Sequence, residues 1–522
     1  MIDVQAMPFI ADIPRVQAER RAGETAFWFE GQSTSFGELE TRSNQVANGL
    51  IGHGVEPGDR VAYLAKNTDA YYEMLFGCAK ARAVMTGVNT RLAAPEIQFI
   101  LADSKARVLF VGKEFYSIID QIRGDLPDLM RVITIDGDRE EWDYHPSWRN
   151  SKPASAPGLT SLPDDDVIQL YTSGTTGKPK GVQLTNANYH AFFRQAAMLD
   201  WSSYAAGEAV MNAMPLFHVA GVNVGVLAAA QGAKTVVLRE IDPTAILKLI
   251  PEHKIAHAFW VPAVIMMLVQ HKDVGATDFS SLKLVSYGAS PIAESLLLDA
   301  KRIMNAGFNQ LYGLTETVGA GTYLPPQAHD PAWGKLRSCG VPWPGAVVRC
   351  LDAAGNVVPT GEVGEIAIKA GFVMKGYWNR PEATEEAIRG GFFYTGDAGY
   401  FDEDGFLYIH DRVKDMIVSG GENVYPAEVE NAVFGHPCVA DVAVIGVPDE
   451  KWGESVKAIV VPKPGETPTA DDIIAWAKER IAGYKCPKTV DFVEVLPRNP
   501  SGKILRKDLR EPYWAGQTRR VG

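Results

Sequence analysis

One short segment combines glycines, hydroxyl side chains and lysines in a way that suits a polyphosphate. It runs from Tyr171 to Gly181 and reads Tyr-Thr-Ser-Gly-Thr-Thr-Gly-Lys-Pro-Lys-Gly. Glycines let backbone N–H groups approach anionic oxygens, hydroxyls add donors and lysines add positive charge. A Walker A loop would need Gly at 172 and Ser or Thr at 179, where this chain has Thr172 and Pro179. We therefore predict a phosphate-binding loop outside the P-loop NTPase class.

Apolar runs followed by polar turns surround this segment between about residues 160 and 320. Four such runs lead into turns rich in Gly, Ser, Thr or Pro, at residues 170–171, 258–261, 284–287 and 309–312. The alternation predicts βα units of an α/β fold, with each turn after the carboxyl end of a strand. Because ligands of open α/β sheets bind at those ends, we expect the four turns to line one pocket.

The pattern changes from about residue 340 to 410, where short alternating strands with close turns predict a β-rich subdomain. An α/β pattern resumes near Asp411. We predict an N-terminal domain over residues 1–410, which includes the β-rich subdomain, and a C-terminal domain over residues 411–522.

Composition narrows the function classes. The 522 residues include 51 basic and 63 acidic side chains, a net charge of −12, which argues against nucleic acid as a partner. The five cysteines are scattered with no C-x-x-C pair, so neither a disulfide framework nor a zinc site is expected. The chain carries no signal-peptide pattern and no run of about 18 apolar residues. We predict a cytoplasmic protein; the sequence does not determine its oligomeric state.

The glycine-rich loop is the first of five motifs that stand in the order and approximate spacing of the AMP-forming acyl-CoA synthetases. The other four are Tyr-Gly-Leu-Thr-Glu at 312–316, Tyr-Thr-Gly-Asp at 394–397, Asp-Arg-Val-Lys-Asp at 411–415 and Pro-Ser-Gly-Lys at 500–503. The chain therefore resembles the adenylate-forming superfamily, and residues 419–426 and 448–454 look most like its fatty-acid–CoA ligase branch. The resemblance implies a large multi-subdomain α/β body and a small, mobile α+β C-terminal domain, with a hinge near Lys414.

The same resemblance implies an acid–thiol ligase. ATP and a carboxylic acid would give an acyl-adenylate and pyrophosphate, and coenzyme A would then displace AMP to give a thioester. A fatty or aryl-alkyl acid is the expected substrate, and a long-chain acid would imply peripheral contact with a membrane. Two alternatives stay open: an acyl-adenylating enzyme that delivers to a carrier protein, and a non-catalytic nucleotide-binding scaffold.

Several segments are implied to bind ATP. The loop would cover the β- and γ-phosphates through Thr172, Ser173, Gly174, Thr175, Thr176, Gly177 and Lys178. The adenine slot would be formed by Gly288, Ala289, Ser290 and Tyr312, and Gly313 is a further candidate for binding the nucleotide. Asp397 would accept hydrogen bonds from both ribose hydroxyls, which suits an ionised carboxylate, and Arg412 would reach the ribose or a phosphate.

The implied reaction assigns roles to further residues. Thr315 would donate to the α-phosphate, and Glu316 offers the hard oxygen ligand that phosphate-bound Mg²⁺ prefers. The ammonium of Lys503 would lie between the carboxylate and the α-phosphate and stabilise the transition state of adenylation. Gly420 and Gly421, which have no side chains, would line the passage for the pantetheine arm of coenzyme A.

His218 is the implied gate of the acyl pocket. No acidic residue accompanies Phe217-His218 to pair a substrate ammonium, so an apolar carboxylic acid is favoured over an amino acid. The candidate wall residues of the acyl pocket are Gly221, Val222, Trp260, Val261, Gly288, Gly313, Val318 and Gly319.

Overall fold

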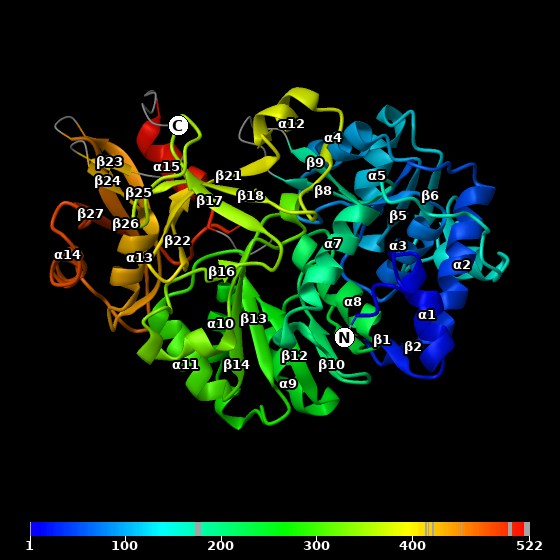
Figure 1. Cartoon of the computed structure of the whole chain (residues 1–522), viewed down its shortest axis with the longest axis horizontal. Helices are drawn as coiled ribbons and strands as arrows, with labels where there is room; N and C mark the ends of the chain where they lie inside the picture. The colour runs from blue at the N-terminus through cyan, green and yellow to red at the C-terminus, as the bar shows by residue number, and fades with distance from the viewer. Residues whose placement is uncertain are drawn as a thin grey trace.

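Four β-sheets with covering helices make up the part of the chain that the computed structural model describes, which comprises residues 2–172, 179–412, 415, 417–419, 422–449, 452–498 and 504–515. Two of the sheets are mostly parallel and form the α/β body (Figure 1). An antiparallel sheet adjoins them, and a separate sheet belongs to the C-terminal domain. The predicted fold class, a large α/β N-terminal body with a smaller C-terminal domain, is confirmed.

The first sheet has nine strands, and its central strands from β14 to β1 run parallel. In spatial order the strands are β16 (Val341–Pro342), β15 (Thr322–Leu324), β14 (Gly307–Tyr312), β13 (Leu284–Gly288), β12 (Ile255–Trp260), β10 (Ala209–Asn212), β11 (Lys234–Val237), β1 (Thr25–Phe29) and β2 (Gln32–Ser35).

The second sheet has eight strands and is parallel from β8 to β7. In spatial order the strands are β19 (Gly376–Tyr377), β9 (Lys180–Thr185), β8 (Asp166–Thr172), β4 (Val84–Gly87), β3 (Arg60–Leu64), β5 (Val108–Val111), β6 (Arg131–Thr134) and β7 (Asp143–Tyr144). The edge strand β19 comes from a distant part of the chain and pairs antiparallel with β9.

Helices cover the two sheets, and their ends follow local capping chemistry. In α9, for example, Asp242 accepts hydrogen bonds from the N–H groups of Thr244 and Ala245, which are left without partners at a helix start. The helices of the body are α1 (Asp12–Arg21), α2 (Phe36–Gly52), α3 (Ala70–Lys80), α4 (Ala94–Ser104), α5 (Tyr116–Ile122), α6 (His145–Asn150), α7 (Asn186–Ala196), α8 (Val219–Gln231), α9 (Pro243–His253), α10 (Pro262–Val269), α11 (Glu294–Met304) and α12 (Pro381–Ala387).

The third sheet occupies the segment for which the sequence predicts a β-rich subdomain. It is antiparallel and consists of β17 (Val347–Leu351), β18 (Gly364–Lys369), β21 (Phe392–Phe401), β20 (Ile388–Arg389) and β22 (Leu407–Arg412). Its last strand contacts helix α13 (Pro426–Phe434) of the C-terminal domain.

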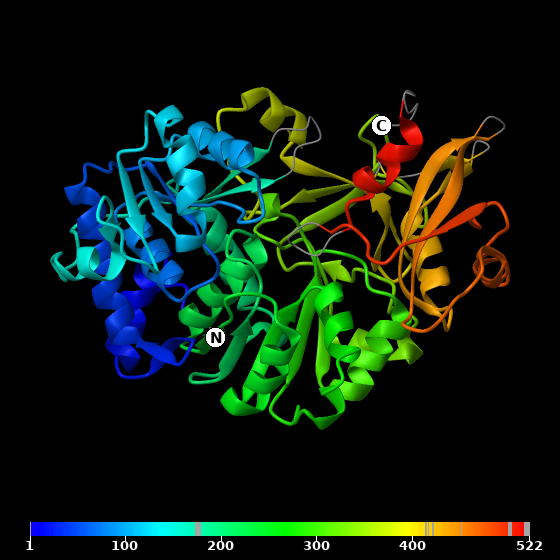
Figure 2. The same cartoon turned by 180° about the vertical axis from the view of Figure 1, so that it is seen from behind.

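The C-terminal domain is built on its own sheet and buries its own apolar core, which includes Val429, Val444 and Val456. Its strands are β24 (Glu422–Val424), β23 (Ile417–Ser419), β26 (Gly453–Pro462), β25 (Val439–Asp449) and β27 (Thr489–Phe492), with helices α13, α14 (Ala470–Lys478) and α15 (Arg506–Trp514). Both views show this domain beside the antiparallel sheet and next to α11 (Figure 2).

Two of the four predicted βα units are correct and two are wrong. Strands β12 and β13 lead into helices α10 and α11. Strand β8 is instead followed by β9, which pairs with it antiparallel, and β14 is followed by a short 3-10 turn (Thr315–Thr317) and the antiparallel β15. The strand ends look alike in sequence because Gly, Ser, Thr or Pro follows each of them within a few residues, whichever way the chain continues.

Within the described ranges no helix combines the length and the apolarity that crossing a bilayer requires.

Candidate functional site

A cleft of about 1300 Å³ lies where the sheets and the C-terminal domain meet. Its lining includes residues from three of the four predicted turns, Thr172, Ala289 and Gly313, and Val261, the last residue of the run before the fourth turn. The structure therefore brings three of these turns and the end of the fourth run to one pocket, although β8 belongs to a different sheet from the other three strands. The antiparallel sheet adds Asp397 to the same lining.

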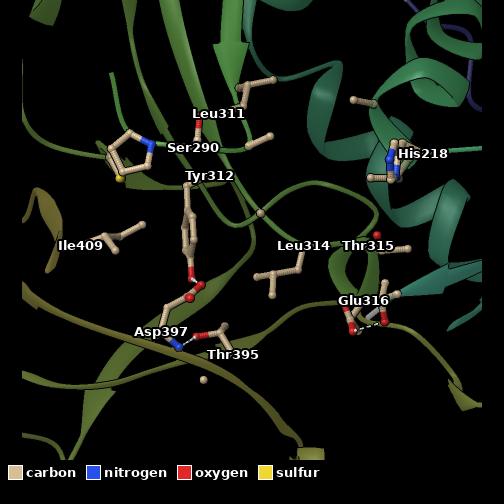
Figure 3. Close-up of a pocket in the computed structure, with 18 of the residues that line it drawn as sticks. His218, Ser290, Leu311, Tyr312, Leu314, Thr315, Glu316, Thr395, Asp397 and Ile409 are labelled. Atoms are coloured by element: carbon tan, nitrogen blue, oxygen red, sulfur yellow. Dashed lines mark hydrogen bonds between the residues drawn. The ribbon is translucent and has the colours of Figure 1, made fainter. Parts of the chain in front are cut away.

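Tyr312 and Asp397 meet across this cleft. Tyr312 ends β14, and its hydroxyl donates a hydrogen bond to Oδ2 of Asp397 over 2.8 Å (Figure 3). Burial and the neighbouring carboxylate raise the pKa of Tyr312, so the phenol stays a donor at neutral pH. The backbone N–H of Asp397 bonds to Oγ1 of Thr395 over 3.1 Å, which fixes the turn. The predicted adenine and ribose residues are thus brought together.

Arg412 reaches the same region by strand pairing. Its Cα is the partner of the Cα of Asp397 in the β21–β22 ladder. The side chain of Arg412 lies outside what the structure describes.

Glu316 is held at the cleft by two hydroxyl groups from distant segments. Its Oε1 accepts a hydrogen bond from the Tyr377 hydroxyl over 2.9 Å and one from the Thr172 hydroxyl over 3.4 Å. Only 7% of Glu316 is exposed, so the direction of its carboxylate depends on such donors. Burial and the Glu316 charge raise the pKa of Tyr377, which keeps that phenol protonated. Thr315, which precedes Glu316 in the same 3-10 turn, also lines the cleft.

These surroundings fit a nucleotide-bound Mg²⁺. Among the residues that the structure describes, no group of three or more His, Cys, Asp or Glu side chains could hold a metal ion by itself. Mg²⁺ in nucleotide sites usually binds one or two carboxylates together with substrate phosphates and water. A buried carboxylate that faces a cleft supplies the protein's share of such a set, and Glu316 has that place.

His218 lies on the other side of the cleft from Tyr312 and Asp397 (Figure 3). It precedes the first residue of α8, and its ring is tilted against that of Phe217 with centroids 4.7 Å apart. Its Nε2 is buried and has no hydrogen-bond partner among the described residues. Burial, with a smaller contribution from Arg91, lowers the pKa of His218 to about 4, so the imidazole is neutral at physiological pH.

The residues next to His218 in the chain that also line the cleft are apolar. They are Met214, Pro215, Val219 and Ala220. Of the predicted wall residues, Val261 and Gly313 line the cleft, whereas Val222, Trp260 and Val318 are fully buried in the hydrophobic cores. Sequence patterns did not separate these two groups, because both are apolar and adjoin the same turns.

Gly288 differs from the other described residues that were predicted to bind the nucleotide. Thr172, Ala289, Ser290, Tyr312, Gly313 and Asp397 line the cleft, but Gly288 does not. A Cβ at Gly288 would lie 2.2 Å from the carbonyl oxygen of Leu311, on the neighbouring strand. Close packing of β13 on β14 therefore requires this glycine, and its place in the adenine slot stays a prediction.

Some predicted residues fall outside the described residues: Ser173, Gly174, Thr175, Thr176, Gly177, Lys178, Gly420, Gly421, Lys503 and the hinge at Lys414. Residues on both sides of two of these segments do line the cleft. Thr172 and Lys180 flank the glycine-rich loop, and Arg498 and Leu505 flank the Pro-Ser-Gly-Lys turn.

The lining residues that the sequence did not single out include Tyr377, Arg498 and Arg506. Arg498 pairs with Asp441 over 2.6 Å, and Arg506 pairs with Glu430 over 2.8 Å. A signal for the two arginines was present, because both stand within a few residues of the Lys503 turn. No local signal marks Tyr377, whose role depends on the edge pairing of β19.

Comparison with known proteins agrees with this arrangement. The family described as AMP-binding enzyme matches residues 14–378, and that described as AMP-binding enzyme C-terminal domain matches residues 428–503. The chain is 40% identical to the fatty acid–[acyl-carrier-protein] ligase ScoC of Streptomyces coeruleorubidus, with 94% of each chain covered. It is also 40% identical to a feruloyl-CoA synthase of an Amycolatopsis species, with 94% of this chain and 96% of the relative covered.

A solved structure shares the fold over nearly the whole chain. It is the anthranilate CoA ligase AuaEII in complex with anthranoyl-AMP, with a TM-score of 0.89, 28% identity and 97% of each chain covered. The two family matches together span most of the chain, and the two relatives are 40% identical to it. The cleft that gathers the motif residues points to the same family. The chain belongs to the AMP-binding enzymes, the adenylate-forming family of acid–thiol ligases.

Proposed function

We propose that the protein is an ATP-dependent carboxylic acid:CoA ligase. It forms an acyl-adenylate from ATP and an apolar carboxylic acid, releases pyrophosphate, and then forms an acyl-CoA thioester and AMP. The observation that carries this proposal is the composition of the cleft. Asp397 and Tyr312 lie on one side, Glu316 lies beside Thr172 at the entrance of the glycine-rich loop, and a neutral His218 lies among apolar side chains.

This order of groups matches the parts of an acyl-adenylate. The ring of Tyr312 and the carboxylate of Asp397 suit adenine and ribose, and we assign Thr315, which lines the same cleft, to the α-phosphate. Mg²⁺ bound by Glu316 would neutralise charge on the phosphates. The apolar residues beside His218 suit the acyl group, because a neutral imidazole brings no charge into an apolar pocket.

The first half-reaction brings two anions together, the substrate carboxylate and the α-phosphate. We assign the ammonium of Lys503 to the space between them, where a positive charge stabilises the transition state most. The flanking residues Arg498 and Leu505 line the cleft, which supports this assignment. No general base is needed, because a carboxylic acid is already ionised at neutral pH.

The second half-reaction needs a passage for the thiol of coenzyme A, which we assign to Gly420 and Gly421. These glycines and Lys503 lie in the same C-terminal domain but serve different steps. We therefore propose that residues 411–522 turn against residues 1–410 about a hinge near Lys414. Separate family matches that end at residue 378 and begin at residue 428 support a boundary between them.

A carrier protein is the second candidate acceptor, because one relative at 40% identity is named as a fatty acid–[acyl-carrier-protein] ligase. The named relatives also differ in their acids, which include fatty and feruloyl groups. The proposal therefore extends to fatty and aryl-alkyl acids as a class.

A substrate screen tests the proposal directly. AMP production is measured with purified protein, ATP, Mg²⁺ and a panel of aliphatic and aryl-alkyl acids, with and without coenzyme A. We expect steady AMP release that requires both an acid and coenzyme A. Pyrophosphate release without thioester formation, relieved by an acylatable carrier protein, would favour the second acceptor. No acid-dependent pyrophosphate release from any acid would contradict the proposal.

A further inference from the structure

Asp103, near the end of α4, contacts strand β8, which leads into the glycine-rich loop, and the segment that follows β19. Its Oδ2 accepts a hydrogen bond from the Tyr171 hydroxyl over 2.8 Å. Its Oδ1 accepts one from Arg380 over 2.6 Å, and its backbone carbonyl accepts one from the indole Nε1 of Trp378 over 2.9 Å. One residue thus holds the end of β8 and the segment that follows β19.

Both partners adjoin the two hydroxyl groups that hold Glu316. Tyr171 precedes Thr172, and Trp378 follows Tyr377, while the hydroxyls of Thr172 and Tyr377 both donate to Oε1 of Glu316. A displacement of either strand end would therefore move a donor away from the carboxylate. Asp103 itself does not touch Glu316, so its effect has to pass through these neighbours.

Further contacts hold β8, the start of β9 and Trp378 together. The Arg60 guanidinium lies over the Trp378 ring, 3.4 Å from its centroid, and also donates to Gln169 of β8 over 3.1 Å. The backbone N–H of Trp378 donates to the carbonyl of Gly181 over 2.7 Å. A Cβ at Gly181 would lie 2.7 Å from Nε2 of Gln169, so the hairpin is closely packed here. The contacts of Asp103 are therefore part of a stiff support.

We propose that Asp103 is a positioning residue for the metal–triphosphate part of the ATP site. It fixes the strand ends that carry Thr172 and Tyr377, and through their hydroxyls it sets the direction of the Glu316 carboxylate. The proposal rests on the proposed function, since it assigns Glu316 to Mg²⁺. Because the side chain and carbonyl of Asp103 bind Tyr171, Trp378 and Arg380, it acts on the triphosphate end of the nucleotide and leaves adenosine binding unchanged.

Binding measurements without any carboxylic acid distinguish an effect on the triphosphate end of the nucleotide from an effect on the adenosine end. Mn²⁺ replaces Mg²⁺ as a paramagnetic probe, and Mn²⁺·ATP binding is followed by electron paramagnetic resonance. Binding of AMP without metal is followed by calorimetry. The variants are Asp103→Ala, Tyr377→Phe and their combination. Asp120→Ala is the matched control, because it removes a carboxylate whose ion pair with Arg139, over 2.9 Å, is remote from the cleft.

We expect Asp103→Ala to weaken Mn²⁺·ATP binding on the order of tenfold and to change AMP binding less than about twofold, which corresponds to loss of one charge-assisted contact. The control should match the wild type in both. Tyr377→Phe should weaken Mn²⁺·ATP binding, and the double variant should lose less than the product of the two single effects, because both act through Glu316.

Equal weakening of AMP and Mn²⁺·ATP binding, or multiplicative effects in the double variant, would overturn the assignment of Asp103. If Asp103→Ala does not fold, as judged by its thermal midpoint, Asp103→Asn takes its place. It keeps the side-chain shape but removes the charge paired with Arg380, and the same selective loss is expected at about threefold. A wild-type protein that binds neither AMP nor Mn²⁺·ATP would overturn the proposed function itself, whereas normal wild-type binding with an unaffected variant would overturn only the role of Asp103.

Discussion

The phenol of Tyr312 and the carboxylate of Asp397 form a 2.8 Å hydrogen bond between two different sheets. Tyr312 ends a strand of the nine-stranded sheet, and Asp397 lies in the antiparallel sheet. The bond ties a ring suited to stacking on adenine to an acceptor suited to ribose. The relative position of the two sheets therefore decides whether one nucleoside can contact both groups.

Asp397→Asn tests the ribose assignment. The amide keeps the shape of the side chain but loses its charge, and hydrogen bonds to charged groups contribute about 1.5–3 kcal/mol. We expect the KM for ATP to rise roughly tenfold or more, because 1.4 kcal/mol corresponds to a factor of ten. Tyr312→Phe is the control, since it keeps the ring and removes only the hydroxyl.

The comparison is made with ATP and 2′-deoxy-ATP. The wild type should prefer ATP, and Asp397→Asn should lose most of that preference. A variant that keeps the full preference would exclude Asp397 from contact with the 2′-hydroxyl.

Lys503→Ala should separate the two half-reactions. Acid-dependent pyrophosphate release should fall at least about a hundredfold, as expected for loss of a charge that stabilises the transition state. Thioester formation from supplied acyl-adenylate should stay close to the wild-type rate. Lys507→Ala, a substitution of an exposed lysine in the same region, should change neither step. Loss of both half-reactions to the same extent would contradict the assignment of Lys503 to adenylation alone.

The pH profile of kcat/KM for the acid should show no protonation step of His218 near neutral pH. Burial lowers its pKa to about 4, so the imidazole protonates only well below the usual value of about 6.5. We expect wild type and His218→Gln to share the same profile of kcat/KM for the acid between about pH 5.5 and 7.5. The variant should instead raise the KM for the acid.

The same shift predicts a stability effect with a defined sign. Because the folded pKa lies below the unfolded one, the contribution of neutral His218 is complete above about pH 6.5 and is lost as pH falls toward 4. The thermal midpoint of the wild type should therefore fall more steeply over this range than that of His218→Gln.

The activity profile tests the same protonation state. An inflection near pH 6.5 in kcat/KM that only the wild type shows would contradict the neutral imidazole.

Gly288→Ala should reduce stability more than it affects nucleotide chemistry. The added Cβ would lie 2.2 Å from a backbone oxygen of the next strand, and such overpacking costs about 1–3 kcal/mol. We expect a lower thermal midpoint, with little change in the KM for ATP at a temperature where the variant is folded. Gly275→Ala is the matched control, because a Cβ there meets nothing within 4 Å. A raised KM for ATP with an unchanged midpoint would instead support the predicted place of Gly288 in the adenine slot.

Much of the site could be predicted because phosphate and carboxylate chemistry requires few residue types in short motifs. Thr172, Ala289, Ser290, Tyr312, Gly313, Thr315, Glu316 and Asp397 all line one cleft. The errors arose where one local pattern fits two structures. A strand followed by a polar turn fitted both β8, which continues into an antiparallel hairpin, and β13, which continues into a helix.

The sequence by itself determined the family, the chemistry and the order of the contributing segments, because the motifs keep their residue types and spacing along the chain. Only the tertiary structure decided which side chains act on one another. Tyr377 reaches Glu316 because β19 joins the edge of a sheet formed by residues far earlier in the chain. Asp103 contacts both the end of β8 and the segment that follows β19. Such contacts depend on how sheets pack, and local periodicity in a single sequence carries no information about that packing.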